Sequence, residues 1–189
     1  MEHGSGKTLS LWMDGVELQS RPVAGEDMTV DVCVVGAGIS GLTVAYKLAR
    51  EGKDVIVIDD GDIGGGETSR TTAHIVNALD ERYFEIERLH GEKGARLAAE
   101  SHTAAIAQIE QIVAEEGIDC DFTRLDGYLF CPPDQSPDIL EKERAAAHRA
   151  GLTDLELVDN APLREFLTGP ALRFPQQAQF HAMKYLNGL

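Results

Sequence analysis

The sequence is poor in cysteine and contains no long apolar run. Its three cysteines, Cys33, Cys120 and Cys131, lack the spacing of a metal site, and they are expected to be free thiols in a reducing compartment. No apolar run approaches the ~18 residues that a membrane span needs, and residues 1–10 lack the apolar centre of a signal peptide. These absences predict a cytoplasmic protein that does not span a membrane.

Basic residues are scarce relative to acidic ones. The chain has 17 Lys and Arg against 32 Asp and Glu, which gives a formal net charge of −15 at pH 7. Such a charge repels nucleic acid and anionic membranes, so neither is expected as a partner. Hydrophobic residues make up 43% of the 189 residues, which suffices for the core of one domain, or of one domain and part of another.

What the chain does contain is a strand, a glycine turn, a helix and a second strand between residues 31 and 60. The apolar, β-branched run Val32–Val35 predicts a strand that is buried on both faces, with Cys33 inside. A helix is expected from about Ser40 to Arg50, and a second strand over Val55–Ile58. This order is typical of a domain that binds the ADP half of a dinucleotide.

Three glycines of the turn have separate roles. Gly36 permits the tight turn, Gly38 lets the backbone approach a pyrophosphate, and Gly41 lets the helix pack closely on the strand. Asp59 stands 21 positions after Gly38, close to the ~20 expected of the acid that accepts the ribose hydroxyls and repels a 2′-phosphate. The motif alone leaves two alternatives to an FAD site open, namely an NAD site and a glycine-rich turn without a ligand.

A second glycine cluster follows at Gly64–Gly66 and leads into the hydroxyl-rich segment Thr68–Thr72, which contains Arg70. Small hydroxyls, backbone N–H groups and one guanidinium beside the pyrophosphate would suit a loop that wraps a long cofactor. The same composition fits a surface loop that caps the next helix, because Ser and Thr favour caps. The residues alone do not separate these two interpretations.

The two motifs together, VVGAGISGL and IDDGDIGGGETSRTTAHI, resemble the FAD-dependent oxidoreductases related to D-amino-acid and glycine oxidases. Within that family the chain is most similar to the bacterial subgroup that carries a C-terminal Rieske iron–sulfur domain. Three further segments match in order: LDERYFEIERLHGEKGARLAAESHTAAI, EEGIDCDFTRLDGYLF and ALRFPQQAQFHAMKYLNGL. The resemblance therefore extends from about Leu11 to the last residue.

The resemblance implies that the cofactor is FAD. It implies that the turn Gly36–Gly41 binds the pyrophosphate and that Asp59 binds the adenosine ribose. It also implies that Ser69–Thr72 belong to the loop that runs along the FAD. It places Ala73 and His74 toward the flavin ring, where His74 is either packed beside the ring or, as in some relatives, covalently attached to FAD. The implied FAD-binding residues are Gly36, Ala37, Gly38, Ile39, Ser40, Gly41, Asp59, Asp60, Ser69, Arg70, Thr71, Thr72, Ala73 and His74.

The expected fold class is α/β, with a Rossmann-like FAD-binding domain plus the beginning of a mixed β-sheet substrate domain. The expected divisions are an N-terminal arm (1–29), the FAD-binding domain with helical segments (30–117) and a partial, truncated substrate-binding domain (118–189). The resemblance implies that this is the N-terminal part of a larger flavoprotein, with a Rieske 2Fe–2S domain in the missing C-terminal part. Such a protein would oxidise a small amine or amino-acid-like substrate by hydride transfer to flavin. A non-catalytic truncated remnant is the alternative, and no catalytic residue is assigned.

The pattern predicts three further helices, over about residues 80–90, 92–116 and 137–150. His102 lies on the apolar stripe of the second of these helices, which favours a core histidine over a metal ligand. Residues 118–130 predict two short strands joined by a hairpin at Asp126–Gly127, and a further strand is expected over residues 155–158.

Two other features have competing interpretations. The segment Gly4–Thr8 resembles the end of a P-loop, but the full pattern needs glycine at position 1 and a preceding strand, so nucleotide hydrolysis is not expected. Four side chains in the second half could face substrate or flavin, although aromatic residues on sheets are more often in the core. They are Tyr128, Phe174, Gln179 and Phe180.

Overall fold

The computed structural model of the chain describes residues 10–18, 25, 27–132 and 135–189. The P-loop-like segment at residues 4–8 lies outside the described residues.

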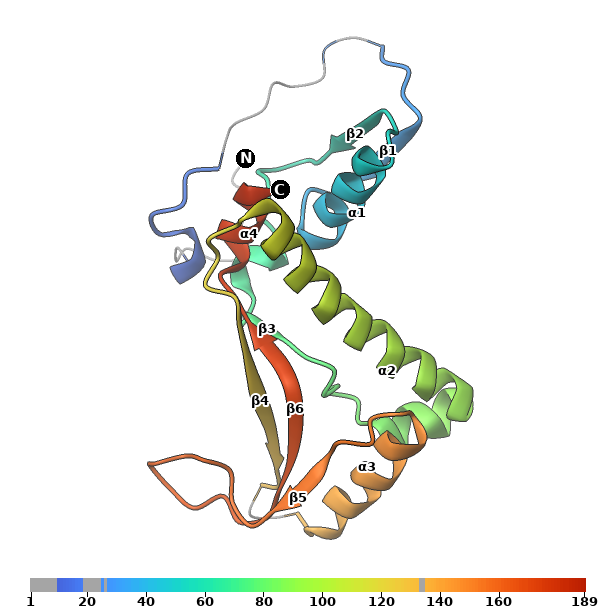
Figure 1. The fold of residues 1–189 in the computed structure, drawn as a ribbon, viewed down its shortest axis with the longest axis vertical. Helices are drawn as coiled ribbons and strands as arrows, with labels where there is room; N and C mark the ends of the chain where they lie inside the picture. The colour runs from blue at the N-terminus through green and yellow to red at the C-terminus, as the bar shows by residue number, and fades with distance from the viewer. Residues whose placement is uncertain (1–9, 19–24, 26, 133–134) are drawn as a thin grey trace. The chain divides into compact units, whose positions relative to one another are not determined.

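Two compact units make up the fold, and Figure 1 gives the order of the elements along the chain. Residues 1–73, 112–122 and 180–189 form the first unit, and residues 74–111 and 123–179 form the second. The expected domain boundary between residues 117 and 118 stays a prediction.

The first unit contains a parallel βαβ motif. Strand β1 (Val32–Val35) pairs in register with β2 (Val55–Ile58), and helix α1 (Ile39–Arg50) connects them. Gly52 has a φ of +80° and reverses the chain after the helix, as a residue without Cβ does readily. The predicted order of strand, turn, helix and strand is confirmed.

The prediction that β1 is buried on both faces is wrong. Val32 and Val34 are half-buried, whereas Cys33 is exposed and Val35 is 79% exposed. Among the described residues β1 pairs with β2 alone. Since side chains alternate along a strand, every second residue of β1 then points to the face that no described element covers.

Three short helices also belong to the first unit: η1 (Leu11–Met13), η2 (Glu67–Arg70) and α4 (Ala182–Gly188). The face of α4 that contains Met183 and Leu186 is buried. Gly64 packs against this face, because a Cβ at Gly64 would lie 2.8 Å from both Leu186 Cδ1 and Met183 Cε. The loop after β2 is thereby held on α4.

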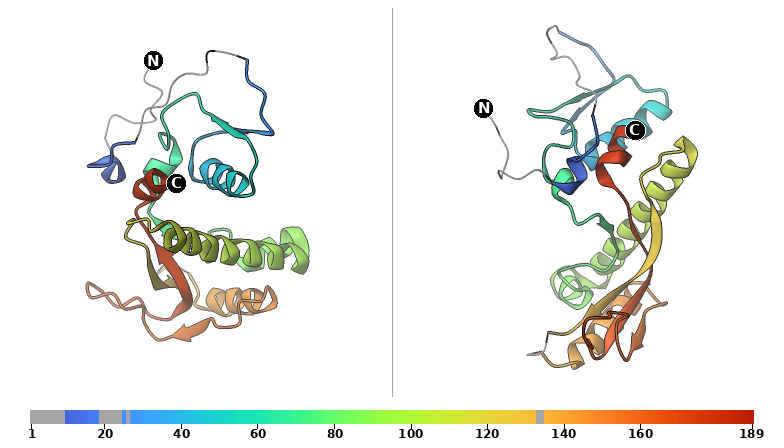
Figure 2. Two further views of the ribbon diagram at one scale, coloured as in Figure 1. Left: turned by 45° about the horizontal axis from the view of Figure 1, so that its top comes forward. Right: turned by 90° about the vertical axis from the view of Figure 1, so that its left-hand side faces the viewer.

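The second unit is built around one long strand, β6 (Ala171–Gln179). Strand β4 (Thr123–Phe130) runs antiparallel to it along its length, and β3 (His74–Ile75) and β5 (Glu156–Val158) pair with its two ends. Figure 2 shows the long pair β4 and β6 from two further directions. The strand expected over residues 155–158 is confirmed as β5, one residue shorter than predicted.

The predicted hairpin at Asp126–Gly127 is wrong, because both residues lie inside β4. Two residues of β6, Pro175 and Gln176, oppose the single residue Asp126, which makes a β-bulge. A Cβ on Gly127 would lie 3.2 Å from Gln177 Cγ. This glycine therefore allows a close approach of two strands, and does not form a turn.

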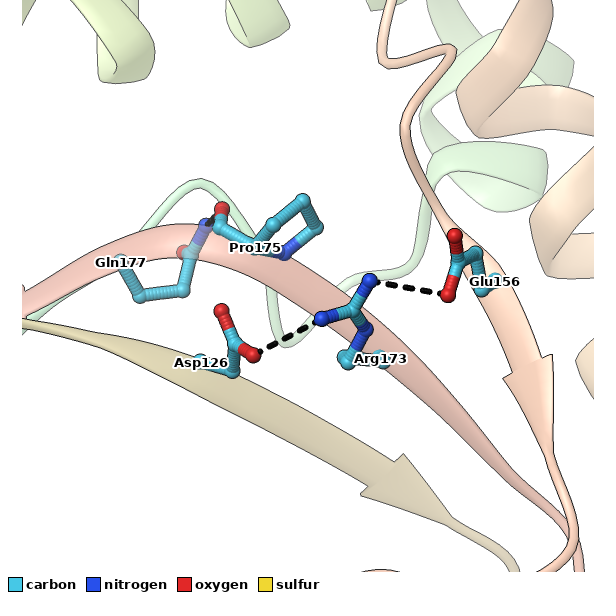
Figure 3. Close-up of polar contacts among 5 residues, drawn as sticks. All are labelled: Asp126, Glu156, Arg173, Pro175 and Gln177. Carbon is cyan, nitrogen blue, oxygen red and sulfur yellow. Dashed lines mark hydrogen bonds and ion pairs between the residues drawn. The ribbon is translucent and has the colours of Figure 1, made fainter.

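Beside the bulge, Arg173 of β6 links three strands (Figure 3). Its guanidinium donates to Asp126 Oδ2 in β4 at 3.1 Å and to Glu156 Oε2 in β5 at 2.8 Å. All three side chains are partly exposed, so each pair contributes at most about 1 kcal/mol to stability.

Two helices complete the second unit, and one of them continues into the first unit. Helix α2 (Tyr83–Glu116) is interrupted at Gly91, where φ is 72° and ψ is 171°. This break lies where the two predicted helices meet, although α2 begins three residues later than predicted. Helix α3 (Asp138–Arg149) agrees with its prediction to within one residue at each end.

The prediction of a core histidine at position 102 is wrong. His102 is exposed, and its Nδ1 lies 3.2 Å from the carbonyl oxygen of Val76. The period of the apolar stripe is helical as expected, but the buried face is rotated from the predicted one. The buried face of α2 contains Ala95, Ala99, Ile106, Ile109 and Ile112.

The four side chains with competing interpretations divide between core and surface. Phe174 and Phe180 are buried, with 1% and 5% exposure, which confirms a core role for both. Tyr128 is half-buried and Gln179 is exposed.

Candidate cofactor site

The glycine turn after β1 has the close packing that its sequence predicts. Gly36 has a φ of +105°, and its N–H donates to the carbonyl oxygen of Ile58 at 2.7 Å. A Cβ on Gly41 would lie only 1.9 Å from the Gly36 carbonyl oxygen. Helix α1 can therefore approach the turn this closely only with glycine at position 41.

The first turn of α1 presents backbone N–H groups at the end of the glycine turn. Gly38 is the N-cap and supplies no side-chain cap, and the first bond within the helix is the one from Leu42 N–H to the Gly38 carbonyl at 3.0 Å. The N–H of Ile39 donates to Thr68 Oγ1 at 3.1 Å. The N–H groups of Ser40 and Gly41 belong to the first turn of α1, so no carbonyl within the helix accepts them. Such a helix end favours an anion.

Asp59 lies at the end of β2, directly beside this turn. Its Oδ2 accepts the Ala37 N–H at 2.6 Å and its Oδ1 accepts the Gly61 N–H at 2.9 Å. These backbone donors, that of Ala37 first, hold the pKa of the carboxyl below its usual value. Asp59 is therefore an exposed, ionised acceptor next to the helix end, as binding of ribose hydroxyls requires.

The second glycine loop meets the first through backbone atoms. The N–H of Gly64 donates to the Ala37 carbonyl at 3.0 Å. Thr68 lies over the start of α1, because a Cβ on Gly38 would come within 3.1 Å of Thr68 Oγ1. Thr68 was expected in the hydroxyl-rich loop, but neither Thr68 nor Gly64 was among the predicted FAD-binding residues. The only signal for them was their place in the second glycine cluster and the hydroxyl run.

The rest of the loop alternates between inward and outward residues. Ser69 is buried and its hydroxyl donates to the Gly66 carbonyl at 2.9 Å, and Ala73 is buried with a φ of +67°. Arg70 and Thr72 are exposed. Thr71 is half-buried between them.

The structure brings the glycine turn, Asp59 and the start of the second loop into one hydrogen-bond network. The segment Gly36–Gly41 is bonded to Asp59 and to the loop at Gly64 and Thr68. Asp60 is exposed beside Asp59, and His74 is exposed as the first residue of β3 in the second unit. The open helix end, the ionised carboxylate and the cradle that admits no Cβ at position 41 fit the phosphate and ribose groups of a dinucleotide.

Comparison with known proteins decides which family this arrangement belongs to. Residues 31–189 match the family model described as FAD dependent oxidoreductase. The chain belongs to this family. Because the family is FAD-dependent, this match selects FAD over NAD, which the glycine motif alone could not do.

Two relatives illustrate the relationship. The chain is 34% identical over 178 residues to a putative Rieske 2Fe-2S iron-sulfur protein, YhfW, of Bacillus subtilis, covering 94% of this chain and 35% of that protein. It is 35% identical over 141 residues to the gamma-glutamylputrescine oxidoreductase of Escherichia coli, covering 74% of this chain and 33% of the enzyme. The chain thus spans about a third of the length of these relatives.

Solved structures share the fold. Glycine oxidase from Geobacillus kaustophilus matches with a TM-score of 0.65 at 19% identity, covering 84% of this chain and 42% of the oxidase. L-amino acid deaminase from Proteus vulgaris matches with a TM-score of 0.65 at 16% identity, covering 91% and 40% respectively. At this identity the likeness establishes the α/β fold and nothing finer.

The described residues contain neither a membrane-spanning helix nor a metal-binding cluster. No helix there has the length and apolar character to cross a bilayer. No group of three or more His, Cys, Asp or Glu side chains in the same residues is arranged to hold a metal ion.

Proposed function

We propose that this chain is the FAD-binding part of a flavin-dependent oxidoreductase that acts on an amine or amino-acid-like substrate. The observation that carries the proposal is the Asp59 carboxylate, which accepts the Ala37 N–H at 2.6 Å beside the start of α1, where the N-cap Gly38 offers no side chain. In a βαβ motif, the carboxylate that follows the second strand binds the ribose, and the N-terminus of the helix binds the pyrophosphate of the same cofactor.

Each part of the site has a role in holding FAD. The turn Gly36–Gly41, including Ala37, Ile39 and Ser40, would bind the pyrophosphate through backbone N–H groups, and Asp59, with Asp60 beside it, would accept the adenosine ribose hydroxyls. Residues Ser69–Thr72 would follow the cofactor from its phosphates, and Ala73 and His74 would lie toward the flavin. Bound FAD would supply the hydride acceptor for the C–H bond beside the substrate nitrogen, so that the C–N bond becomes C=N and the N–H proton is released. The residues of this chain hold and orient the cofactor.

The names of the relatives support a substrate class and a partner. The E. coli relative is a gamma-glutamylputrescine oxidoreductase and the structural neighbours include glycine oxidases, so an amine or amino acid is the substrate class we infer. The B. subtilis relative is a Rieske 2Fe-2S protein. A Rieske centre beyond the residues of this chain would take the electrons from the flavin one at a time.

Titration of the purified chain with FAD, NAD and NADP tests the cofactor assignment. We expect FAD to raise the melting temperature and to bind with quenched flavin fluorescence, and NAD and NADP to do neither. Asp59→Asn should weaken FAD binding by roughly ten- to hundredfold, because a charged acceptor is lost. Asp62→Asn, an exposed carboxylate three residues away, is the matched control and should bind FAD like the unaltered chain. Equal stabilisation by NAD and FAD would refute the proposal.

A further inference from the structure

The short helix η1 is bonded to two carbonyls of the second cofactor loop. The indole Nε1–H of Trp12 donates to the Thr71 carbonyl oxygen at 2.7 Å. The hydroxyl of Ser10 donates to the carbonyl oxygen of Ser69. Both acceptors lie in the loop that is expected to follow FAD.

Polar contacts, and not apolar burial, hold η1 in this place. None of the three residues of η1 is buried, and Leu11 is 74% exposed. Ser10 also orders η1 itself, because its Oγ accepts the Trp12 N–H at 3.1 Å. The two bonds from Ser10 and Trp12 to the loop therefore help to place the helix.

The Trp12 ring also contacts His181, the N-cap residue of α4. The ring of His181 meets it edge to face, with centroids 5.2 Å apart and an interplanar angle of 80°. His181 is itself anchored, since its Nδ1 accepts the Lys184 N–H at 3.3 Å and its own N–H donates to the Cys120 carbonyl at 2.7 Å. Trp12 is therefore held between the loop and the start of α4.

Along residues 69–73, residues with a hydrogen-bonded carbonyl alternate with residues whose side chains are exposed. The carbonyls of Ser69 and Thr71 are taken by Ser10 and Trp12, and the carbonyl of Ala73 accepts the Phe180 N–H at 3.1 Å. The intervening side chains, Arg70 and Thr72, are exposed. The backbone of the loop is thus bonded at three carbonyls, while the Arg70 guanidinium and the Thr72 hydroxyl are exposed.

We propose that Ser10 and Trp12 form a clasp that positions the loop 69–73, so that Arg70 and Thr72 contact bound FAD and retain it. This inference rests on the proposed FAD-binding function. Ser10 and Trp12 are positioning residues, because they act on the cofactor only through the loop.

The rate at which FAD leaves the whole chain after dilution tests the clasp. Trp12→Phe keeps the aromatic contact with His181 and removes the indole donor, and Ser10→Ala removes the second donor. Each should accelerate FAD release roughly three- to tenfold, as the loss of one hydrogen bond does. Leu11→Ala, an exposed neighbour with no bond to the loop, is the matched control and should release FAD at the unaltered rate.

A second measurement separates positioning from general stability. In a chain that already carries Arg70→Ala and Thr72→Ala, Trp12→Phe should no longer change the release rate, because the side chains that the clasp presents are gone. An undiminished effect in that background would overturn the proposal. The proposal would also be overturned if Trp12→Phe and Ser10→Ala released FAD at the same rate as Leu11→Ala.

The two proposals fail in different ways. If the unaltered chain binds FAD but the clasp variants behave like the control, only the clasp is wrong. If the unaltered chain does not bind FAD, the proposed function fails and the clasp falls with it. Amide hydrogen exchange of residues 67–73 without FAD gives an independent check, because it should rise in Trp12→Phe and Ser10→Ala. Unchanged exchange would show that the two donors do not fix the loop, and would also overturn the clasp.

Discussion

Asn77 and Gln177 are 100 residues apart in the sequence and bond to each other twice. The Asn77 N–H donates to Gln177 Oε1 at 2.8 Å, and Gln177 Nε2 donates to Asn77 Oδ1 at 2.9 Å. Gln177 Nε2 also reaches the carbonyl of Pro175 at the bulge, and Asn77 Nδ2 donates to Thr103 Oγ1 at 2.9 Å. The pair joins the segment after the cofactor loop to the central strand of the second unit.

Replacement of Gln177 by Leu should destabilise the protein. Gln177 is 1% exposed and Asn77 is 7% exposed, so the substitution leaves the Asn77 N–H and Oδ1 buried without partners. We expect a loss of about 1–3 kcal/mol in the free energy of unfolding, measured by urea denaturation. Gln179→Leu, an exposed position on the same strand, should change it by less than about 0.5 kcal/mol. Equal effects of the two substitutions would argue against a structural role for the pair.

Glu143 should make stability depend on pH in an unusual direction. Its carboxylate accepts the N–H groups of Tyr83 and Phe84 at the start of α2, at 2.9 and 3.3 Å. Burial nevertheless raises the pKa of Glu143 above its ordinary value of 4.5, despite these donors. The folded protein then binds the proton more tightly than the unfolded chain, so this group's contribution to stability is present below pH 4.5 and is lost as the pH rises through the raised pKa.

The difference in unfolding free energy between the unaltered protein and Glu143→Gln isolates this contribution. We expect that difference to fall as the pH rises from 4.5, because the glutamine side chain does not titrate. A difference that is flat with pH would contradict the prediction.

Gly41→Ala should abolish or severely weaken FAD binding. Its Cβ would lie 1.9 Å from the backbone oxygen of Gly36, so α1 must move away from the turn. We expect a loss of about 1–3 kcal/mol in stability and at least a roughly tenfold loss of FAD affinity, measured by calorimetry. Gly66→Ala is the control, because Gly66 has a φ of −82° and an added Cβ meets nothing within 4 Å. Similar FAD affinities for the two variants would show that the close approach at Gly41 is unimportant.

Two of the three thiols, Cys33 and Cys120, should react with a thiol reagent in a fixed order. Cys33 is exposed and should react first. Cys120 is 1% exposed, and burial raises its pKa, so its reaction should wait for unfolding. Cys33→Ser should remove the fast phase and leave the slow one, as followed by absorbance. A fast phase that survives this substitution would show that it does not come from Cys33 and would contradict the prediction.

The βαβ motif could be predicted from sequence because its determinants are local. The turn at Gly36, the break at Gly52 and the acid at Asp59 each follow from backbone conformation or chain spacing, and the structure places them as expected. The family resemblance extended this to FAD and to the second loop. By contrast, the clasp at Trp12 depends on a partner 59 residues away, and nothing in the local pattern specifies it.

The errors share one physical origin, which is that burial and turns depend on neighbours that a local pattern does not show. Asp126–Gly127 has the composition of a hairpin turn, but its pairing with β6 at the bulge keeps it within a strand. Cys33 belongs to an apolar strand, but no described element covers its face. His102 lies on a helix of the expected period, and only tertiary packing decides which side of that helix is buried.

The contacts around the second cofactor loop also set the order in which the chain can assemble. Ala73 bonds to Phe180, Asn77 bonds to Gln177, and the ring of Trp12 rests against His181. During translation at about 5–20 residues per second, residue 181 follows residue 73 by roughly 5–20 s. The glycine turn is therefore synthesised long before the residues that fix its neighbouring loop, and the proposed FAD site should form late in the folding of the nascent chain.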